Sequence, residues 1–225
     1  MKHTNKTVDF NIAAQLAEDT EQRRLMYLIL SRLYFMEVTA EQLDQMRLEE
    51  HSFEGYLEGF QELLQKNDTE TLRRELAADF AALFLGLSAH PVAPYESVYT
   101  SEEKLLMQDA RDAVVREYQS ESLLPSKIQG ADSVPEDHIS FELEYMAALC
   151  QKPCSCSQSD GTCGGAYILK KQLNFLEEHL LKWVPKLCDD VFQRARTSFY
   201  QSVAAMTKDF LKEEKEYLEA ALSCS

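Results

Sequence analysis

The sequence predicts an all-helical fold, a single helical domain of two lobes joined by a hinge. It has 7 glycines and 6 prolines among 225 residues, too few for the repeated tight turns of a sandwich or barrel of short strands. Apolar residues recur at helical spacing instead, and the chain is long enough to bury a sizeable core. The expected division is an N-terminal lobe at 1–124, a linker at 125–134 and a C-terminal lobe at 135–225.

The first expected helix covers about residues 12–35. Four of its apolar residues fall on one helical stripe: Leu25, Leu28, Ile29 and Leu33. Thr39 and Gln42 have the spacing of a capping box, which predicts a short amphipathic helix carrying Leu43 and Met46. The glycine-containing stretch 53–60 is expected to follow that helix.

Two more helices are expected before the linker. The first, at about 69–85, is predicted by four apolar residues on one face, and Gly86 is placed to close it in a left-handed conformation. Those residues are Leu72, Leu76, Phe80 and Leu83. Thr100 and Glu103 form another capping-box pattern, so the second helix is expected to continue from there to about residue 120. Its apolar residues are Leu105, Leu106, Ala110, Val114 and Tyr118.

The stretch 123–132 carries Pro125 and Gly130 and has no helical period, which indicates a boundary between lobes. After it, Ser133 and Glu136 predict a third capped helix start, with Pro135 tolerated in the first turn. The buried stripe of that helix is expected to be Ile139, Leu143 and Met146. A Cys-rich polar loop at 150–165 should lead to two final helices, at about 166–183 and 187–222, separated at Pro185.

Composition excludes several classes of function. The net charge of −15 produces a field that repels phosphates, so a nucleic-acid partner is not expected, whereas a cationic partner is favoured. No apolar run of about 18 residues suits a membrane span. The polar segment 1–10 has no apolar stretch after it, which predicts that there is no export signal and that the protein is cytoplasmic.

Sequence patterns for catalysis and for cofactor binding are missing. There is no Gly-x-Ser-x-Gly elbow, no phosphate-binding glycine loop and no second Glu/His pair to match His138 and Glu142 in a di-metal bundle. We therefore expect no cofactor and no enzymatic activity.

Four cysteines lie within fourteen residues of the Cys-rich loop: Cys150, Cys154, Cys156 and Cys163. Four thiolates suffice for a zinc or iron-sulfur site, but the spacings match no common motif of either kind. Two interpretations stay open. Either the loop carries reduced thiols, or the chain is a metal-binding or redox-sensing helical protein.

Two segments invite a binding interpretation. Acidic residues Glu136 and Asp137 precede His138 at a helix start, where they either cap the helix or bind a basic peptide. The segment 90–103 holds two prolines that restrict its backbone and two tyrosines, Tyr95 and Tyr99, which either line a groove or pack in the core.

Several separated motifs resemble the TorD/DmsD family of redox-enzyme maturation chaperones, over roughly residues 25–211. They are ADFAALFLG (78–86), PVAPYESVY (91–99), PEDHISFELEYM (135–146), and the pair FLEEHLLKWVPKLCDDV and FYQSVAAMTKDFL (175–211). The order Pro135-Glu136 departs from the Glu-Pro order of many relatives, and the Cys-rich loop is not part of the family pattern.

The resemblance implies an all-helical cytoplasmic chaperone without a catalytic cycle. Its partner would be a molybdopterin oxidoreductase, which it binds by the twin-arginine signal peptide and holds in the apo form until cofactor insertion. Carried over to this chain, the peptide site comprises Pro135, Glu136, Asp137, His138, Tyr95, Ser97 and Tyr99. Asp137 would accept hydrogen bonds from a guanidinium of the arginine pair, and His138 would either orient Asp137 or contact the peptide backbone. The chain is expected to be a monomer or a domain-swapped dimer, since a proline-bearing hinge permits exchange between chains.

Overall fold

The computed structural model describes residues 4–48, 58–123, 133–152 and 164–223, with side chains from residue 18 onward in the first helix. These residues are mostly helical and form no β-strand, which confirms the all-α fold. The elements are α1 (Thr4–Phe35), α2 (Ala40–Leu48), α3 (Glu58–Lys66), α4 (Thr69–Phe84), α5 (Glu96–Thr100), α6 (Asp109–Ser120), α7 (Ile139–Gln151), α8 (Gly164–Phe175), the π-helical turn η2 (Leu176–Leu180), α9 (Leu181–Arg194) and α10 (Ser198–Ser223).

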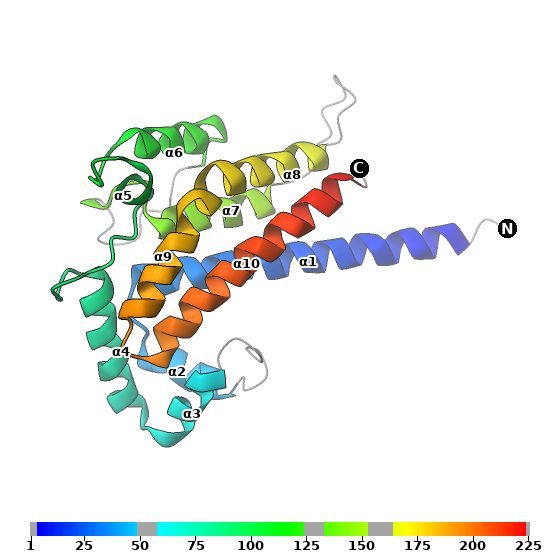
Figure 1. The fold of residues 1–225 in the computed structure, drawn as a ribbon. Helices are drawn as coiled ribbons and strands as arrows, with labels where there is room; N and C mark the ends of the chain where they lie inside the picture. Colours follow the sequence, from blue (N-terminus) through cyan, green and yellow to red (C-terminus); the bar gives the residue numbers. More distant parts are fainter. Residues whose placement is uncertain (1–3, 49–57, 124–132, 153–163, 224–225) are drawn as a thin grey trace.

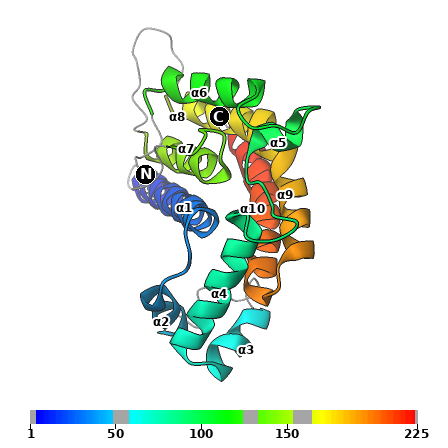
Figure 2. The same ribbon diagram turned by 90° about the vertical axis from the view of Figure 1, so that its left-hand side faces the viewer.

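The long helix α1 packs lengthwise against α7, while α10 packs against α8 and α9 (Figure 1). At one end of this bundle, α2, α3 and α4 contact one another, and α5 lies against α6 and α9 at the side (Figure 2). One continuous cluster of buried apolar side chains runs from α1 to α10. Within the described residues, no helix combines the length and the apolar character that a bilayer span requires.

Helix α1 begins earlier than expected, and its buried face is rotated from the predicted stripe. Leu25 is nearly half exposed, so its assignment to the core was wrong, while Leu28 and Ile29 are only partly buried. The buried apolar residues of α1 are Tyr27, Leu30, Leu33 and Tyr34. Helix α1 packs against both α7 and α10, and Tyr27 and Tyr34, which lie outside the predicted stripe, contact Glu214 and Thr207 of α10.

The signals expected at the start of α2 and at the end of α4 are confirmed. The Thr39 amide donates to Gln42 Oε1 at 2.9 Å and the Gln42 amide donates to Thr39 Oγ1 at 3.3 Å, which confirms the capping box of α2. The four predicted residues of α4 are buried, and Gly86 has φ of 72°, the left-handed conformation expected there. Helix α3 was missed, although Phe60 and Leu64 are buried at i, i+4 spacing.

The capping box predicted at Thr100 does not form. Thr100 instead ends the short helix α5, where its hydroxyl donates to the Glu96 carbonyl at 2.9 Å. Helix α6 therefore starts at Asp109, and Leu105 and Leu106 are exposed in the preceding loop rather than buried. Val114 and Tyr118 are buried as predicted.

Helix α7 begins five residues later than predicted, because Pro135 to His138 form a turn in which the His138 amide donates to the Pro135 carbonyl at 3.2 Å. The cap is His138, not Ser133. The predicted stripe of Ile139, Leu143 and Met146 is fully buried.

The break predicted at Pro185 is also wrong. Pro185 lies inside α9, which continues from α8 through the π-helical turn η2. Proline removes one helical donor, and the buried residues Trp183, Val184 and Leu187 around it offset that loss by packing. The chain breaks at 195–197, where Asp79 of α4 accepts hydrogen bonds from the Arg196 and Thr197 amides.

The expected linker at 125–134 and the Cys-rich loop at 150–165 fall largely outside the described residues, which include only 133–134, 150–152 and 164–165 of them. The division into two lobes stays a prediction.

Candidate functional site

The segment 91–99 and the turn 135–138 lie side by side. The Glu96 amide donates to the Asp137 carbonyl at 3.0 Å, and the Ile139 amide donates to the Pro94 carbonyl at 3.0 Å. Tyr95 and His138 form an isolated antiparallel bridge between these bonds. The structure thus brings together the two segments that the sequence singled out separately.

Asp137 holds the start of α5 in place. Its Oδ2 accepts a hydrogen bond from the Ser97 amide at 2.9 Å, so the carboxylate caps a helix that is forty residues away in the sequence. The residue is fully buried, and its Oδ1 has no hydrogen-bond partner. One acceptor oxygen of Asp137 is therefore enclosed but unused.

His138 is an uncharged ring in this arrangement. Its Nδ1 accepts from the Ser140 amide at 3.2 Å, which places the proton of the neutral ring on Nε2. Burial lowers the pKa of His138 to about 3, because a charged imidazolium would lose its hydration. Tyr95 and Phe35 pack edge-on against the ring, with centroids 5.0 and 5.6 Å away.

Pro135 and Glu136 occupy the rest of the turn. Pro135 is buried, whereas Glu136 is partly exposed and binds Arg111 of α6 through two oxygens, at 2.7 and 2.8 Å. The hydrogen bond from Arg111 lowers the pKa of Glu136. This ion pair ties the turn to α6.

A second set of buried polar residues, which no sequence pattern predicts, lies behind the turn. Glu96 Oε2 is 2.8 Å from His179 Nδ1, and Glu142 Oε2 accepts from Trp183 Nε1 at 3.2 Å. Glu142 is fully buried and its Oε1 has no partner. In the sequence, Glu142 stands out as a carboxylate inside the apolar run of α7. Its neighbours Trp183, Glu96 and Asp137, however, come from α9, α5 and the turn 135–138.

Burial raises the pKa of Glu142 well above its ordinary value of 4.5, and the nearby charges of Glu96 and Asp137 raise it further. The unfolded chain ionises this carboxyl near pH 4.5, whereas the folded protein retains the proton to higher pH. Above pH 4.5 ionisation therefore favours the unfolded state, and the Glu142 contribution to stability is lost as pH rises.

We accordingly expect Glu142→Gln to gain stability relative to the parent as pH rises above 4.5, by up to about 1.4 kcal/mol per pH unit. The amide keeps an oxygen for the Trp183 indole and cannot ionise. Urea unfolding from pH 4.5 to pH 8 measures the difference. Glu144→Gln, on the same helix but not fully buried, controls for the loss of one charge. A Glu142→Gln difference that stays constant across pH would contradict a raised pKa.

The accessible part of the site is a cavity of about 540 Å³ between segment 91–104 and α9. Its lining is Pro91, Ala93, Val98, Tyr99, Lys104, Lys186, Asp189, Asp190 and Arg194. Tyr99 donates to Asp190 Oδ2 at 2.9 Å, and its ring packs against Trp183 with centroids 5.6 Å apart. Tyr99 thus belongs both to the cavity wall and to the core boundary, whereas Tyr95 packs on His138.

Charges of both signs surround this cavity. Arg194 binds Asp190 Oδ1 at 3.2 Å and donates to the Pro91 carbonyl at 3.0 Å, which closes one side. Asp189 pairs with Lys208 of α10 at 2.7 Å. The cavity therefore offers apolar walls together with charged side chains of both signs.

Among the described residues, no group of three His, Cys, Asp or Glu side chains is arranged to hold a metal ion. Cys154, Cys156 and Cys163 lie outside those residues. Burial raises the pKa of Cys150 to about 11, so its thiol is protonated at neutral pH. Its sulfur accepts a long hydrogen bond of 3.8 Å from Gln172.

The matching family model and the curated relatives indicate one family. The family model described as nitrate reductase delta subunit matches residues 47–189. The chaperone protein TorD of Aliivibrio fischeri is 30% identical, over 91% of this chain and 98% of its own, and TorD of Shewanella oneidensis is 28% identical over 90% and 93%. A solved structure from Archaeoglobus fulgidus, described as a candidate redox enzyme maturation protein, matches with 19% identity and a TM-score of 0.44, over 88% of this chain and 93% of its own.

Proposed function

The chain belongs to the TorD family of chaperones, and we propose that it is a cytoplasmic chaperone for the assembly of a molybdopterin-containing oxidoreductase. The observation that carries this proposal is the match to named chaperones over nearly the whole length of both chains. Those names also confirm the expectation that the protein is not an enzyme, and they do not favour the metal-binding or redox-sensing alternative.

The proposed ligand is the twin-arginine signal peptide of the client enzyme, which the chaperone binds while it holds the apo-enzyme until cofactor insertion and export. A leader peptide has a cationic region followed by an apolar region. The net charge of −15 would attract the first, and the cavity beside Tyr99 suits the second. We propose a monomer or a domain-swapped dimer as the working form.

We assign two kinds of role to the site residues. Tyr99 lines the cavity and would touch the peptide. Glu136, which is partly exposed and paired with Arg111, would be the accessible acidic residue of the turn. The other site residues would act as positioning residues, because their contacts fix segment 91–99. They are Asp137, His138, Pro135, Tyr95 and Ser97. The alternative is that the free Oδ1 of Asp137 accepts a guanidinium directly after the turn opens.

Calorimetry with a synthetic twin-arginine leader separates these roles. If Asp137 positions α5, Asp137→Ala should weaken binding by about tenfold or more through loss of the cap, whereas Asp137→Asn, which still accepts from the Ser97 amide, should stay within about threefold. Under direct recognition of the guanidinium, the two variants should weaken binding alike.

Asp68→Ala provides the control, because Asp68 caps α4 in the same way, through the Thr71 amide at 3.0 Å, in the part of the fold away from this cavity. It should leave peptide binding unchanged. If Asp137→Ala and His138→Ala both bind as tightly as the parent, the site assignment is wrong. Pull-down from anaerobically grown cells should recover a molybdopterin oxidoreductase, and failure to recover one would count against the client class.

A further inference from the structure

Three consecutive apolar side chains are exposed in the loop between α5 and α6. Leu105, Leu106 and Met107, called here the apolar ridge, are 53%, 46% and 64% exposed. Single exposed apolar residues are common on protein surfaces, but exposing a run of three to water is unfavourable unless a binding partner covers them.

The backbone presents this ridge in a fixed conformation. Lys104 and Met107 have φ of 52° and 59°, a left-handed conformation that disfavours residues with a side chain and persists only where the surroundings impose it. The loop is anchored just after the ridge, where the Gln108 amide donates to Ser97 Oγ at 3.2 Å. Ser97 is itself held by Asp137, so the ridge is tied to the turn 135–138.

The ridge has acidic surroundings. Glu102 and Glu103 precede it, and Asp109 and Asp112 follow it, all four exposed. Lys104 is the one exposed basic residue in the stretch 102–112, since Arg111 is partly buried and binds Glu136 and Asp112. Lys104 also lines the cavity beside Tyr99, which makes the ridge continuous with that cavity.

We propose that the apolar ridge binds the apolar stretch of a peptide segment that carries basic residues beside it, with the acidic residues of 102–112 facing those basic residues. This inference rests on the proposed function and extends it, because it gives the apolar region of the leader a surface separate from the turn 135–138. Charge complementarity selects this occupant over a purely apolar or acidic segment.

The test compares the parent with a ridge variant that carries Leu105→Gln, Leu106→Gln and Met107→Gln. Two synthetic peptides serve as probes: a complete twin-arginine leader and its cationic part alone. For the complete leader we expect about tenfold to hundredfold weaker binding by the ridge variant, since three side chains lose apolar burial on binding. The cationic part alone should bind both proteins equally.

A variant with Leu25→Gln and Leu48→Gln is the matched control, because these leucines are also exposed but lie on α1 and α2. It should bind like the parent. All of these variants should keep the parent's midpoint in urea, since the replaced side chains are exposed.

The outcomes separate the two proposals. If the parent binds the complete leader and the ridge variant binds it equally well, the ridge inference is overturned and the proposed function stands. If the parent does not bind the leader, both are overturned. If a leader with its basic residues changed to Glu binds the parent undiminished, the choice of a basic partner is wrong.

Discussion

Glu214→Ala should lower the free energy of unfolding by about 3–5 kcal/mol, the usual loss when one partner of a buried ion pair is removed. Arg23 and Glu214 are 8% and 3% exposed, and two hydrogen bonds of 2.7 and 2.9 Å join them. Glu214 also accepts from the Tyr27 hydroxyl at 2.9 Å. The substitution would leave the Arg23 guanidinium buried with only a neutral partner, Gln172, at 2.6 Å.

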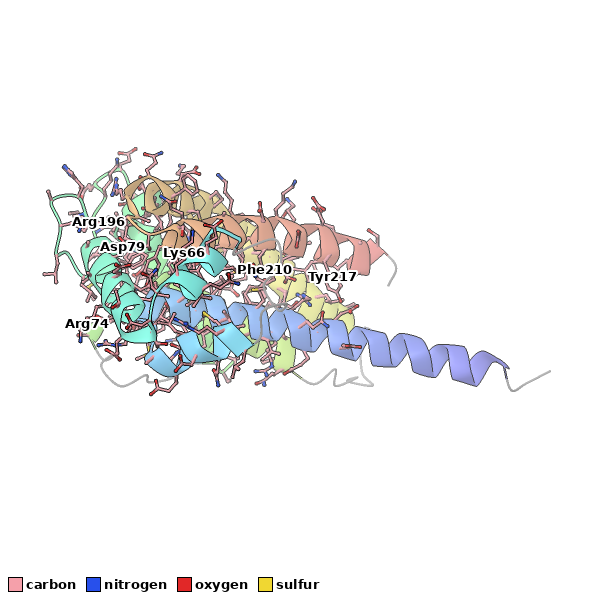
Figure 3. The ribbon with its side chains drawn as sticks, turned by 90° about the horizontal axis from the view of Figure 1, so that it is seen from below. Lys66, Arg74, Asp79, Arg196, Phe210 and Tyr217 are labelled. Carbon is pink, nitrogen blue, oxygen red and sulfur yellow. The ribbon has the colours of Figure 1, made fainter. Side chains whose placement is uncertain are left out.

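The network joins α10 to α1 and α8, so its loss should affect the whole bundle rather than one helix end. Figure 3 shows Phe210 and Tyr217 on the same helix, and the Tyr217 ring lies 4.5 Å from the Arg23 guanidinium. Urea unfolding followed by circular dichroism measures the effect.

Two controls sharpen this test. Glu62→Ala removes an exposed pair with Lys66 on α3 and should leave the urea midpoint nearly unchanged. The double variant Arg23→Met, Glu214→Leu should recover much of the lost stability, since apolar residues of similar volume can replace a buried pair. A Glu214→Ala loss no larger than that of Glu62→Ala would contradict a buried, uncompensated Arg23.

Elements defined by neighbouring residues could be predicted from the sequence. The capping box of α2 and the apolar face of α4 depend on contacts within a few positions, and Gly86 acts through its own backbone. The sequence predictions fail where a residue distant in the sequence determines where a helix starts or ends. Asp137 caps α5, so a contact from a residue forty positions away, and not the local pattern at Thr100, determines where a helix starts in this segment.

The same distinction applies to the candidate site. Tyr95, Asp137 and His138 were singled out from the sequence, and the structure brings them together. The pairing of Glu96 with His179 and of Glu142 with Trp183 could not be predicted, since each joins residues on separate helices. Nor does any local pattern indicate that the π-helical turn η2 turns His179 toward Glu96.

A residue distant in the sequence also caps the start of α10, and Asp79→Ala should show how much this cap contributes to the free energy of unfolding. Asp79 is buried in α4, and its carboxylate accepts from the Arg196 amide at 3.1 Å, the Thr197 amide at 2.8 Å and Thr197 Oγ1 at 2.7 Å. Figure 3 shows Asp79 beside the turn that carries Arg196. Alanine would leave these donors without their acceptor at the start of α10, so we expect a loss of about 3 kcal/mol in the free energy of unfolding.

Asp79→Asn distinguishes the cap from simple packing. Asparagine keeps one acceptor oxygen and nearly the same volume, so it should recover part of the alanine loss, while the exposed cap variant Asp68→Ala should cost clearly less than Asp79→Ala. Equal losses for Asp79→Ala and Asp68→Ala would refute the idea that Asp79 decides where α9 ends and α10 begins. A larger loss at Asp79 would mean that this boundary is set by a carboxylate on α4, more than a hundred residues earlier, which explains why the chain breaks at 195–197.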